Sequence, residues 1–508
     1  MLTRLKVSGF KNLVDVDVRF GPFTCIAGGN GVGKSNLFDA ICFLSALASK
    51  TLNEAAMAVR EEGASASDIR RLFHQVDGEY DKAMRFEAEM LVPSKAVDDF
   101  GQEAAATTTL LCYTLELEYA AEPDSRQPAR LTILKEKLTY LPRSNANASL
   151  LFPHKPGTWR KSVLTGKHRT ADFISSKVDG NGTRVVMLHQ DGGGHGQPLS
   201  RPAQNLPRTI LSGASAAECP TVLCAKREME SWRRLQLEPS ALRQYDEINA
   251  PHHLDMHGGH LPATLFYLAG GNQPDAVRSS AIYSGVANRL GDLIDDVRSV
   301  SIDKDDKREN LTLMVSGRDG TLLPARSLSD GTLRFLALAV MDLDTQSPGV
   351  ICLEEPENGI HPERIPAMLQ LLQNIASDTD EAVAEDNPLR QVIINTHSPI
   401  VVAEVDDDSI LVAYPQEVCQ GEKRFHAVAF GCLPDTWRTK ADPPAPIVAK
   451  GELLAYLNPI NQRKKDSQSP MLEVADGIQA KKSKPRNRVA DRNDLQILLP
   501  GLEGYDRL

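Results

Sequence analysis

The sequence predicts an α/β fold, and three observations support this prediction. Segments rich in β-branched, leucine and aromatic residues recur through residues 1–142, as in a strand-rich lobe. Strand and helix patterns alternate between residues 301 and 410, which is typical of a parallel sheet covered by helices. A glycine-rich loop at residues 28–35 joins an apolar segment to a helical pattern. With 508 residues, 41% of them hydrophobic, the chain can form two or three domains.

The first lobe is predicted to begin with three strands, the glycine-rich loop and a helix. The strands are expected in LTRLKVSGF, VDVDVRF and FTCIAG, and the helix in FDAICFLSALAS. Further strands are expected in AMRFEAEMLV, TTLLCYTLELEYA and RLTILKEKLTYL. We therefore assign residues 1–142 to one strand-rich unit.

The middle of the chain loses this regularity. Residues 143 to about 225 collect Gly, Asn, Ser, Pro and His, as in HQDGGGHGQPLSRPAQNLPRT. Helical patterns return in CAKREMESWRRLQL, LPATLFYLA and GVANRLGDLIDDV. We expect an inserted, mostly helical and irregular subdomain at 143–262, the second α/β half at 263–415, a strand and helix extension at 416–460, and a tail at 461–508.

The stretch GGNGVGKSNL matches the pattern G-x-x-x-x-G-K-[ST] in a strand–loop–helix context. Its glycines let backbone N–H groups surround a phosphate, and the helix N-terminus adds a positive dipole end. Lys34 can reach the β- and γ-phosphates and Ser35 can ligate Mg²⁺. The sequence thus predicts binding of a nucleoside triphosphate with Mg²⁺. The residues expected at the nucleotide are Asn30, Gly31, Gly33, Lys34, Ser35 and Asn36.

An apolar strand in SPGVICLEEPENGIHPE ends in adjacent carboxylates. A glycine-rich phosphate loop needs one carboxylate for its metal and another to orient water. By position, Glu354 would hold Mg²⁺ through water, and Glu355 would position or polarise the attacking water. The alternative is an acidic, solvated strand end without a catalytic role.

Two further segments can supply groups to an anion. In ARSLSDGTLRFLALAVMDL, Ser329 and Gly331 open a helical pattern whose N-terminus offers N–H groups and a hydroxyl, although plain N-capping explains the same residues. In VIINTHSPIV, His397 follows a buried strand and can hydrogen-bond a γ-phosphate, although an ordinary loop histidine would fit as well.

In this order, GGNGVGKSN, LSDGT, CLEEPENGIHP and NTHSP resemble the ABC-type ATPases of the RecF, SMC and OLD group. The resemblance spans residues 1–415 and implies an ABC-type P-loop ATPase head. It also implies a head-to-head dimer, in which each ATP lies between one P-loop and residues 329–332 of the other subunit. His397 would be the switch histidine, and residues 358–361 would belong to a loop that crosses the dimer.

The same resemblance suggests two more positions near the nucleotide. Lys11 in GFKN would correspond to a basic residue of SMC-like heads, and Gln75 in RRLFHQV is the candidate for the Q-loop glutamine. Glu354 departs from the group, since many relatives have Asp there, but its longer side chain still reaches a water on the metal.

Three other features are interpreted as structural. HHLDMHGGH at residues 252–260 offers four imidazoles, but it precedes a predicted helix entry and is not expected to bind metal. EVDDDS, with Asp406 to Asp408, is expected to be a solvated turn rather than a nuclease cluster. The spacing of Cys219 and Cys224 fits no zinc pattern.

Composition and charge limit the partners. The formal charge of −10 argues against a broadly basic surface that binds nucleic acid. Residues 461–492, however, are locally basic and suggest a flexible segment. That segment would contact nucleic acid, contact an acidic partner, or only solubilise the chain. No apolar run of membrane-spanning length and no signal peptide are recognisable, so a cytoplasmic protein without a membrane partner is expected.

The main functional hypothesis is a dimerising ATPase that acts as motor or sensor in a bacterial anti-phage defence complex. It would control a separately encoded nuclease or toxin. In this respect the chain resembles Septu-type ATPases. A RecF-like repair ATPase that clamps DNA is one alternative. An ATP-bound scaffold that sequesters an effector, with hydrolysis incidental, is another. The sequence leaves these three open, while a transporter ATPase fits least.

Overall fold

A computed structural model describes most of the chain up to residue 453. The described residues are 1–59, 69–120, 130–166, 171–191, 197–272, 275–291, 297–421, 423–449 and 453. The predicted basic tail at 461–508 lies outside these residues, as does the end of the extension predicted at 416–460. No helix in the described ranges is long and apolar enough to cross a membrane.

A six-stranded core sheet organises the molecule, with the strand order β14-β19-β20-β3-β21-β22. Neighbouring strands run parallel from β14 to β21, and β22 pairs antiparallel to β21 at the edge. The strands are β3 (Phe23–Ala27), β14 (Arg233–Leu235), β19 (Gly349–Glu354), β20 (Arg390–Thr396), β21 (Ile410–Gln420) and β22 (Lys423–Cys432). The sheet therefore places β3, which leads into the glycine-rich loop, between β20 and β21, two strands from the far end of the chain.

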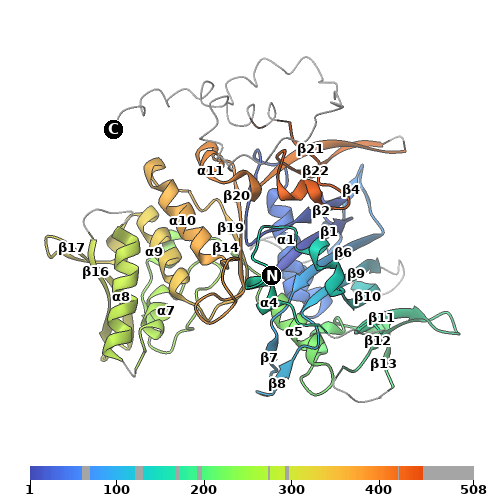
Figure 1. Cartoon of the computed structure of the whole chain (residues 1–508), viewed down its shortest axis with the longest axis horizontal. Helices are drawn as coiled ribbons and strands as arrows, with labels where there is room; N and C mark the ends of the chain where they lie inside the picture. The colour runs from blue at the N-terminus through green and yellow to red at the C-terminus, as the bar shows by residue number, and fades with distance from the viewer. Residues whose placement is uncertain are drawn as a thin grey trace.

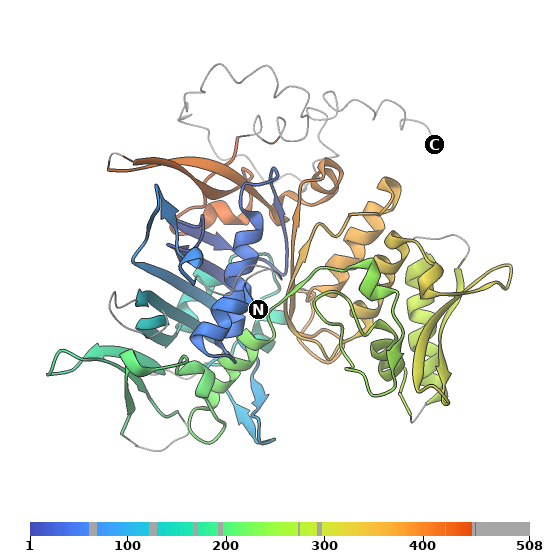
Figure 2. The ribbon, with the colours of Figure 1, turned by 180° about the vertical axis from the view of Figure 1, so that it is seen from behind.

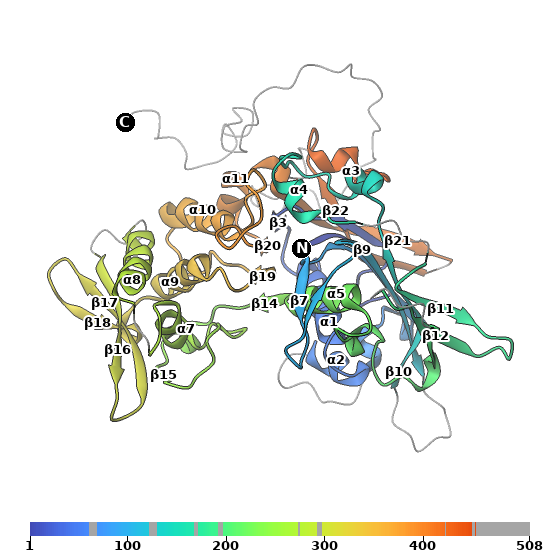
Figure 3. The same ribbon diagram turned by 60° about the horizontal axis from the view of Figure 1, so that its bottom comes forward.

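Side chains of β19 alternate between two hydrophobic clusters, one on each face of the core sheet. Val350 and Cys352 pack in the cluster that contains α1 (Lys34–Leu47). Ile351 and Leu353 pack in the cluster that contains α9 (Asp330–Leu343) and α10 (Ile365–Ile375). This period-2 alternation puts α1 and α9 on opposite sides of β14 and β19 (Figure 3). We call the two faces of the core sheet the α1 face and the α9 face.

An antiparallel eight-stranded sheet covers α1, with the order β13-β12-β11-β10-β9-β6-β1-β2. Phe43 of α1 packs against Phe10 and Phe86, at ring-centroid distances of 5.9 and 5.6 Å. The strands are β1 (Leu2–Ser8), β2 (Val16–Arg19), β6 (Ala83–Leu91), β9 (Leu110–Ala120), β10 (Arg130–Tyr140), β11 (Ile174–Val178), β12 (Arg184–Leu188) and β13 (Leu199–Pro202).

The boundaries expected around the inserted subdomain differ from the fold. Strands β11 to β13 extend the sheet of β9 and β10, so residue 143 does not begin a separate subdomain. The helical pattern in CAKREMESWRRLQL also ends early: α5 (Pro220–Glu230) stops, and β14 begins at Arg233. Pairing of β14 with the buried strand β19 overrides the local helical preference there.

A buried carboxyl group ties an irregular segment to this sheet. Glu136 of β10 is completely buried and accepts hydrogen bonds from the backbone N–H groups of Ile210 (2.8 Å) and Leu211 (2.9 Å). The Tyr113 hydroxyl donates to the same carboxyl group at 3.2 Å. Burial raises the pKa of Glu136 to about 7.

The second lobe lies on the α9 face and combines helices with a small antiparallel sheet (Figures 1 and 2). In that sheet β17 pairs with β15, β16 and β18. The elements are α6 (Pro239–Leu242), β15 (Asp246–Glu247), α7 (Leu261–Leu268), α8 (Ala276–Gly291), β16 (Val297–Asp305), β17 (Asn310–Gly317) and β18 (Leu322–Pro324). Because β15 and α7 both belong to this lobe, residue 262 is not a boundary of the fold.

The remaining helices and strands are short. They are α2 (Leu52–Ala58), β4 (Gln75–Val76), β5 (Glu79–Tyr80), β7 (Lys95–Val97), β8 (Glu103–Ala105), α3 (Ala146–Ser149), α4 (Trp159–Val163) and α11 (Pro399–Glu404).

Candidate functional site

The loop between β3 and α1 requires glycine at several positions. Gly31 and Gly33 have φ angles of 76° and 113°, in the region that side chains disfavour. A Cβ at Gly33 would lie 2.1 Å from the Asn12 side-chain nitrogen, and a Cβ at Gly28 would lie 2.6 Å from the Ala413 carbonyl oxygen. The P-loop is therefore held closely between β21 and the segment after β1.

Lys34 begins α1 and turns back over the loop. Its Nζ donates to the carbonyl oxygens of Gly28 (2.7 Å) and Gly29 (2.9 Å). Burial lowers the pKa of the Lys34 ammonium, and three nearby glutamates, of which Glu355 has the largest effect, oppose this shift. The ammonium is thus held at the loop that the sequence assigns to phosphate.

Ser35 and Glu354 meet across the site from opposite ends of the sequence. The Ser35 hydroxyl lies 3.3 Å from Glu354 Oε2, and the two residues are 319 positions apart. Glu354 Oε1 is buried without a hydrogen-bond partner in the described structure, although Arg234 Nη1 lies 3.7 Å away. Burial raises the pKa of Glu354. A hydroxyl and a carboxylate with an unbonded oxygen are hard donors that fit Mg²⁺.

Glu355 occupies the turn immediately after β19, with a φ of 45°. Its backbone N–H donates to the backbone carbonyl and the side-chain oxygen of Asn395, both at 3.1 Å. His397 Nδ1 lies 2.6 Å from Glu355 Oε1, and Asn358 Nδ2 donates to Oε2 at 2.8 Å. Non-glycine residues in this left-handed region are uncommon and occur often at functional sites. Both carboxyl oxygens of Glu355 are fixed by this arrangement.

The segment after β1 is attached to the P-loop through Asn12. Its side-chain nitrogen donates to the Val32 carbonyl at 3.0 Å, and its oxygen accepts from Asn36 Nδ2 at 2.7 Å. Lys11 has a φ of 50° and pairs with Asp39 of α1 at 2.5 Å. Lys11 therefore lies beside the first turns of α1, on the helix that follows the P-loop. Asn30 is exposed in the loop itself.

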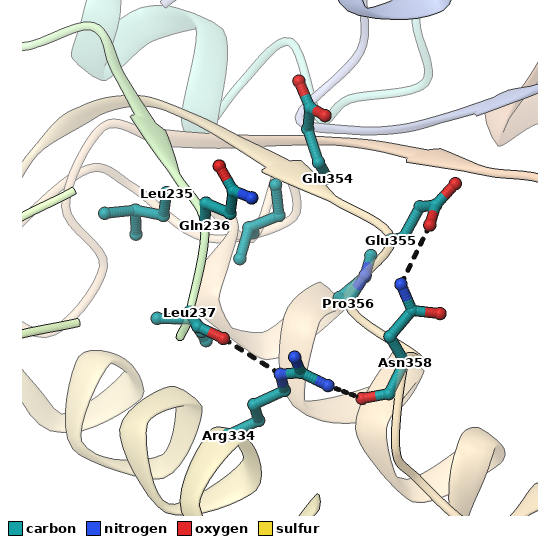
Figure 4. Close-up of a pocket in the computed structure, with 9 residues that line it drawn as sticks. Leu235, Gln236, Leu237, Arg334, Glu354, Glu355, Pro356 and Asn358 are labelled. Carbon is teal, nitrogen blue, oxygen red and sulfur yellow. Dashed lines mark hydrogen bonds between the residues drawn. The ribbon is translucent and has the colours of Figure 1, made fainter. Parts of the chain in front are cut away.

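Gln75 and Gln236 take different places. Gln75 is exposed in β4, which forms a small hairpin with β5. Gln236 follows β14 and lines a hollow together with Glu354 and Glu355 (Figure 4). The remaining residues that line this hollow are Leu235, Leu237, Arg334, Leu353, Pro356 and Asn358.

Ser329 is the N-cap of α9, and its hydroxyl accepts from the Thr332 N–H at 3.3 Å. A Cβ at Gly331 would lie 2.4 Å from the Gly359 carbonyl oxygen, so the start of α9 packs directly on the turn that follows Glu355. Arg243 pairs with Asp330 at 2.5 Å. The capping role is present in the structure and leaves the remaining N–H groups of the first turn available.

Arg334 links α9 to both walls of the hollow. Its Nε donates to the Leu237 carbonyl at 2.9 Å, and its Nη1 donates to the Asn358 carbonyl (Figure 4). Because Asn358 also holds Glu355, the α9 helix and the turn after β19 are joined by hydrogen bonds.

Sequence reasoning missed several residues of this site. Asp39 binds both Lys11 and Arg234, the latter at 3.1 Å. Its position four residues after Ser35 gave a signal, because residues i and i+4 share one helix face. Arg234 gave no signal, since its place depends on β14 pairing with β19.

The features interpreted as structural have separate partners. His252 stacks on Tyr267, whereas His253, His257 and His260 lie 3.2 to 3.5 Å from three different carboxylates. No group of three metal-binding side chains occurs among the residues that the structure describes. The Asp408 carbonyl accepts from Trp437 Nε1 at 3.0 Å.

Two protein families match parts of the chain. A family described as "AAA domain, putative AbiEii toxin, Type IV TA system" matches residues 244–403, and one described as "AAA domain" matches residues 4–116. The second segment contains the P-loop, and the first contains Ser329, Glu354, Glu355 and His397. A DNA replication and repair protein RecF of Phocaeicola vulgatus is 38% identical over 64 residues, which are 12% of this chain. The match spans only 17% of that relative's length.

Solved structures of SMC heads are similar over much of the chain. An SmcHead bound to the C-winged helix domain of ScpA is 14% identical, with a TM-score of 0.44, 85% of this chain covered and 98% of the other. An SMC head domain from Thermotoga maritima is 11% identical, with a TM-score of 0.35 and the same coverage. At these scores the likeness does not extend to function.

The predicted fold class is confirmed: the chain has the α/β architecture of an ABC-type P-loop ATPase head. The P-loop follows β3, and the two carboxylates lie at the end of β19, which is separated from β3 in the sheet by β20 alone. The two AAA-domain matches include the P-loop and the carboxylates at the end of β19.

Proposed function

We propose that this chain binds ATP with Mg²⁺ between the P-loop and the turn after β19, and hydrolyses it there. One observation carries the proposal: Ser35 and Glu354 lie 3.3 Å apart, on the first turn of α1 and at the end of β19. Ser35 and Glu354 would hold Mg²⁺, the second through water. The bound metal would neutralise charge on the phosphates.

The other groups take roles that follow from their contacts. Lys34 leaves the carbonyls of the loop for the β- and γ-phosphates. Glu355 orients the attacking water and polarises it as a general base. His397 keeps Nδ1 towards Glu355, which leaves Nε2 for the γ-phosphate. Asn30, Gly31, Gly33 and Asn36 surround the phosphates, and Lys11 stands next to them, paired with Asp39.

Gln236 is a better candidate than Gln75 for a glutamine that faces the metal. It shares the hollow with Glu354 and Glu355, whereas Gln75 lies in the hairpin of β4 and β5 (Figure 4). Replacing Gln236 by Ala should raise the Mg²⁺ concentration needed for half-maximal ATPase activity, and Gln75→Ala should not. The reverse result would make Gln75, rather than Gln236, the glutamine that faces the metal.

Ser329 and Gly331 complete the site of a second copy of the chain in this proposal. They start α9 on one face of the core sheet, while the P-loop starts α1 on the other. A head-to-head dimer would bring the N-terminus of one α9 to the triphosphate on the other P-loop, where its N–H groups suit an anion.

ATP use is proposed to control a separately encoded effector, a nuclease or toxin, in a bacterial anti-phage defence complex. The family description that names a putative toxin and a toxin–antitoxin system supports this context. The RecF match supports a second candidate, an ATPase that clamps DNA. Under the scaffold alternative, ATP binding alone would suffice to hold the effector.

Glu355→Gln tests the chemistry. It should keep ATP bound and lower kcat by about 100-fold or more, since general-base catalysis contributes that much. Retained nucleotide, dimer mass and phosphate release are measured on the same preparation. Normal turnover would remove Glu355 from its role.

The biological role is tested with the full chain expressed together with the products of its neighbouring genes. The defence proposal predicts stable co-purification of one product and a change in its nuclease activity or toxicity between wild type and Lys34→Ala. ATP-dependent affinity for duplex DNA without such a product would favour the repair candidate. Unchanged effector control in Glu355→Gln would favour the scaffold.

A further inference from the structure

A third carboxylate lies in the turn that carries Glu354 and Glu355. Glu357 is only 7% exposed, and its Oε1 accepts a hydrogen bond from the Thr396 hydroxyl. Its Oε2 is buried without a hydrogen-bond partner in the described part of the chain. Keeping a carboxyl group in such a place costs free energy, so its retention calls for an explanation.

Thr396 connects Glu357 to the residues on either side of the site. It is the last residue of β20 and is fully buried. Its carbonyl accepts from the Gly28 N–H at 3.3 Å, at the start of the P-loop. Its hydroxyl also accepts from the Ser398 N–H at 2.9 Å.

The Thr396 hydroxyl therefore brackets His397. It belongs to the residue before His397 and binds the backbone of the residue after it, which fixes the path of the chain at the histidine. Glu357 accepts a hydrogen bond from the same hydroxyl and so fixes the direction of its O–H group. Glu355, two residues earlier in the same turn, holds the imidazole ring at 2.6 Å.

We propose that Glu357 is a positioning residue for His397 and acts through the hydroxyl of Thr396. One turn of the chain thus holds the histidine twice: Glu355 holds its ring and Glu357 holds its backbone. The inference rests on the proposed ATP hydrolysis, in which His397 contacts the γ-phosphate. Neither Glu357 nor Thr396 contacts the nucleotide in this account.

Removing the hydroxyl while keeping the shape of the side chain tests the inference. Thr396→Val should lower kcat by about tenfold, because a small displacement of a positioned group costs that much or more. KM for ATP should stay within about twofold, since the backbone contact of Thr396 to Gly28 remains. Thr396→Ser, which keeps the hydroxyl, should restore kcat. Thr396→Ala gives the same comparison with serine if the valine variant does not fold.

The effect must pass through His397 to support the inference. In a His397→Ala background, Thr396→Val should change the remaining kcat by less than about twofold. Thr132→Val is a matched control, since it removes a similar hydrogen bond from a buried threonine to Glu118, 3.1 Å long, in the eight-stranded sheet. It should leave kcat unchanged.

Two results would overturn the inference: full kcat in Thr396→Val, or an equal loss with and without His397. Failure of the underlying function looks different. In that case the wild-type chain itself would show no ATP hydrolysis, and Lys34→Ala would bind nucleotide as the wild type does.

Discussion

The two faces of the core sheet carry the two halves of the proposed site, and they are built differently. On the α1 face, the P-loop needs glycines at φ 76° and 113°, and Ser35 already meets Glu354 within one chain. On the α9 face, Ser329 caps a regular helix, and Gly331 in the first turn of that helix packs against the Gly359 carbonyl oxygen. Under the proposed function, the metal-binding and catalytic groups come together within each subunit, whereas Ser329 and Gly331 would act only on the nucleotide of a second copy.

Removing the lysine of the α1 face should have the largest effect. Lys34→Ala should weaken ATP binding by roughly 100-fold or more, because the ammonium is the main charge for the β- and γ-phosphates. Binding is measured by equilibrium dialysis of labelled ATP. Lys6→Ala is the control, since it removes a partly exposed lysine of β1 that pairs with Glu87. Equal affinity in the two variants would contradict the assignment of the P-loop.

Blocking the α9 face should abolish turnover and spare binding. Ser329→Arg places a large side chain where the partner's phosphate would lie, so kcat should fall below detection while ATP affinity of the free subunit changes less than about threefold. Ser299→Arg on β16 of the same lobe is the control. A mixture of Ser329→Arg with Lys34→Ala contains dimers with one intact composite site and should regain part of the activity. Normal ATP hydrolysis by Ser329→Arg would contradict the proposed division of roles between the α1 and α9 faces.

A change of pH should alter how much Glu136, in the eight-stranded sheet on the α1 face, contributes to the free energy of unfolding. The pKa of Glu136 is raised to about 7 in the folded chain against 4.5 as its ordinary value. The folded state therefore keeps a proton that the unfolded state loses, and the free energy of unfolding should fall as pH rises from about 4.5 to about 7, by at most ~1.4 kcal/mol per pH unit. Urea denaturation across this range, with wild type and Glu136→Gln, measures it. A wild-type profile as flat as that of the glutamine variant would contradict the shift.

A single methyl group should disturb the contact on the α9 face. Alanine normally stabilises a helix relative to glycine by about 1 kcal/mol. At Gly331 the added Cβ would lie 2.4 Å from the Gly359 carbonyl oxygen, so Gly331→Ala should instead destabilise the protein, by about 1 to 2 kcal/mol. Gly291→Ala, at the end of α8, should not, because the added Cβ would have no atom of the described residues within 4 Å apart from its own helix and chain neighbours. Thermal unfolding of the two variants decides, and a stabilised Gly331→Ala would show that α9 is not pressed against the turn.

The sequence predicted the fold class and the parts of the site that depend on local chemistry. A phosphate loop needs glycines, a lysine and a hydroxyl in a fixed order, so Lys34 and Ser35 could be identified from spacing. Glu354 and Glu355 followed from a buried strand ending in carboxylates. Where these residues lie agrees with that reasoning, and their roles in hydrolysis stay predictions.

What the sequence could not predict depends on long-range pairing. Arg234, Gln236 and Thr396 are placed by strands β14 and β20, whose neighbours come from distant parts of the chain. The irregular composition of residues 143–225 hid strands β11 to β13, because short antiparallel strands gain their stability from cross-strand partners rather than from local propensity. The boundaries at 143 and 262 were misplaced for the same reason.

The place of β3 inside the core sheet also determines when that sheet can form during synthesis. Its two neighbours, β20 and β21, begin at Arg390 and Ile410. At roughly 5 to 20 residues per second, the ribosome would need on the order of 20 to 80 s to deliver them after β3 has emerged. During that interval an apolar segment that ends up fully buried has neither of its sheet partners. If the chain binds ATP as proposed, a nascent chain would do so only late in translation, and retained ATP would indicate that the polypeptide has been made nearly through β21.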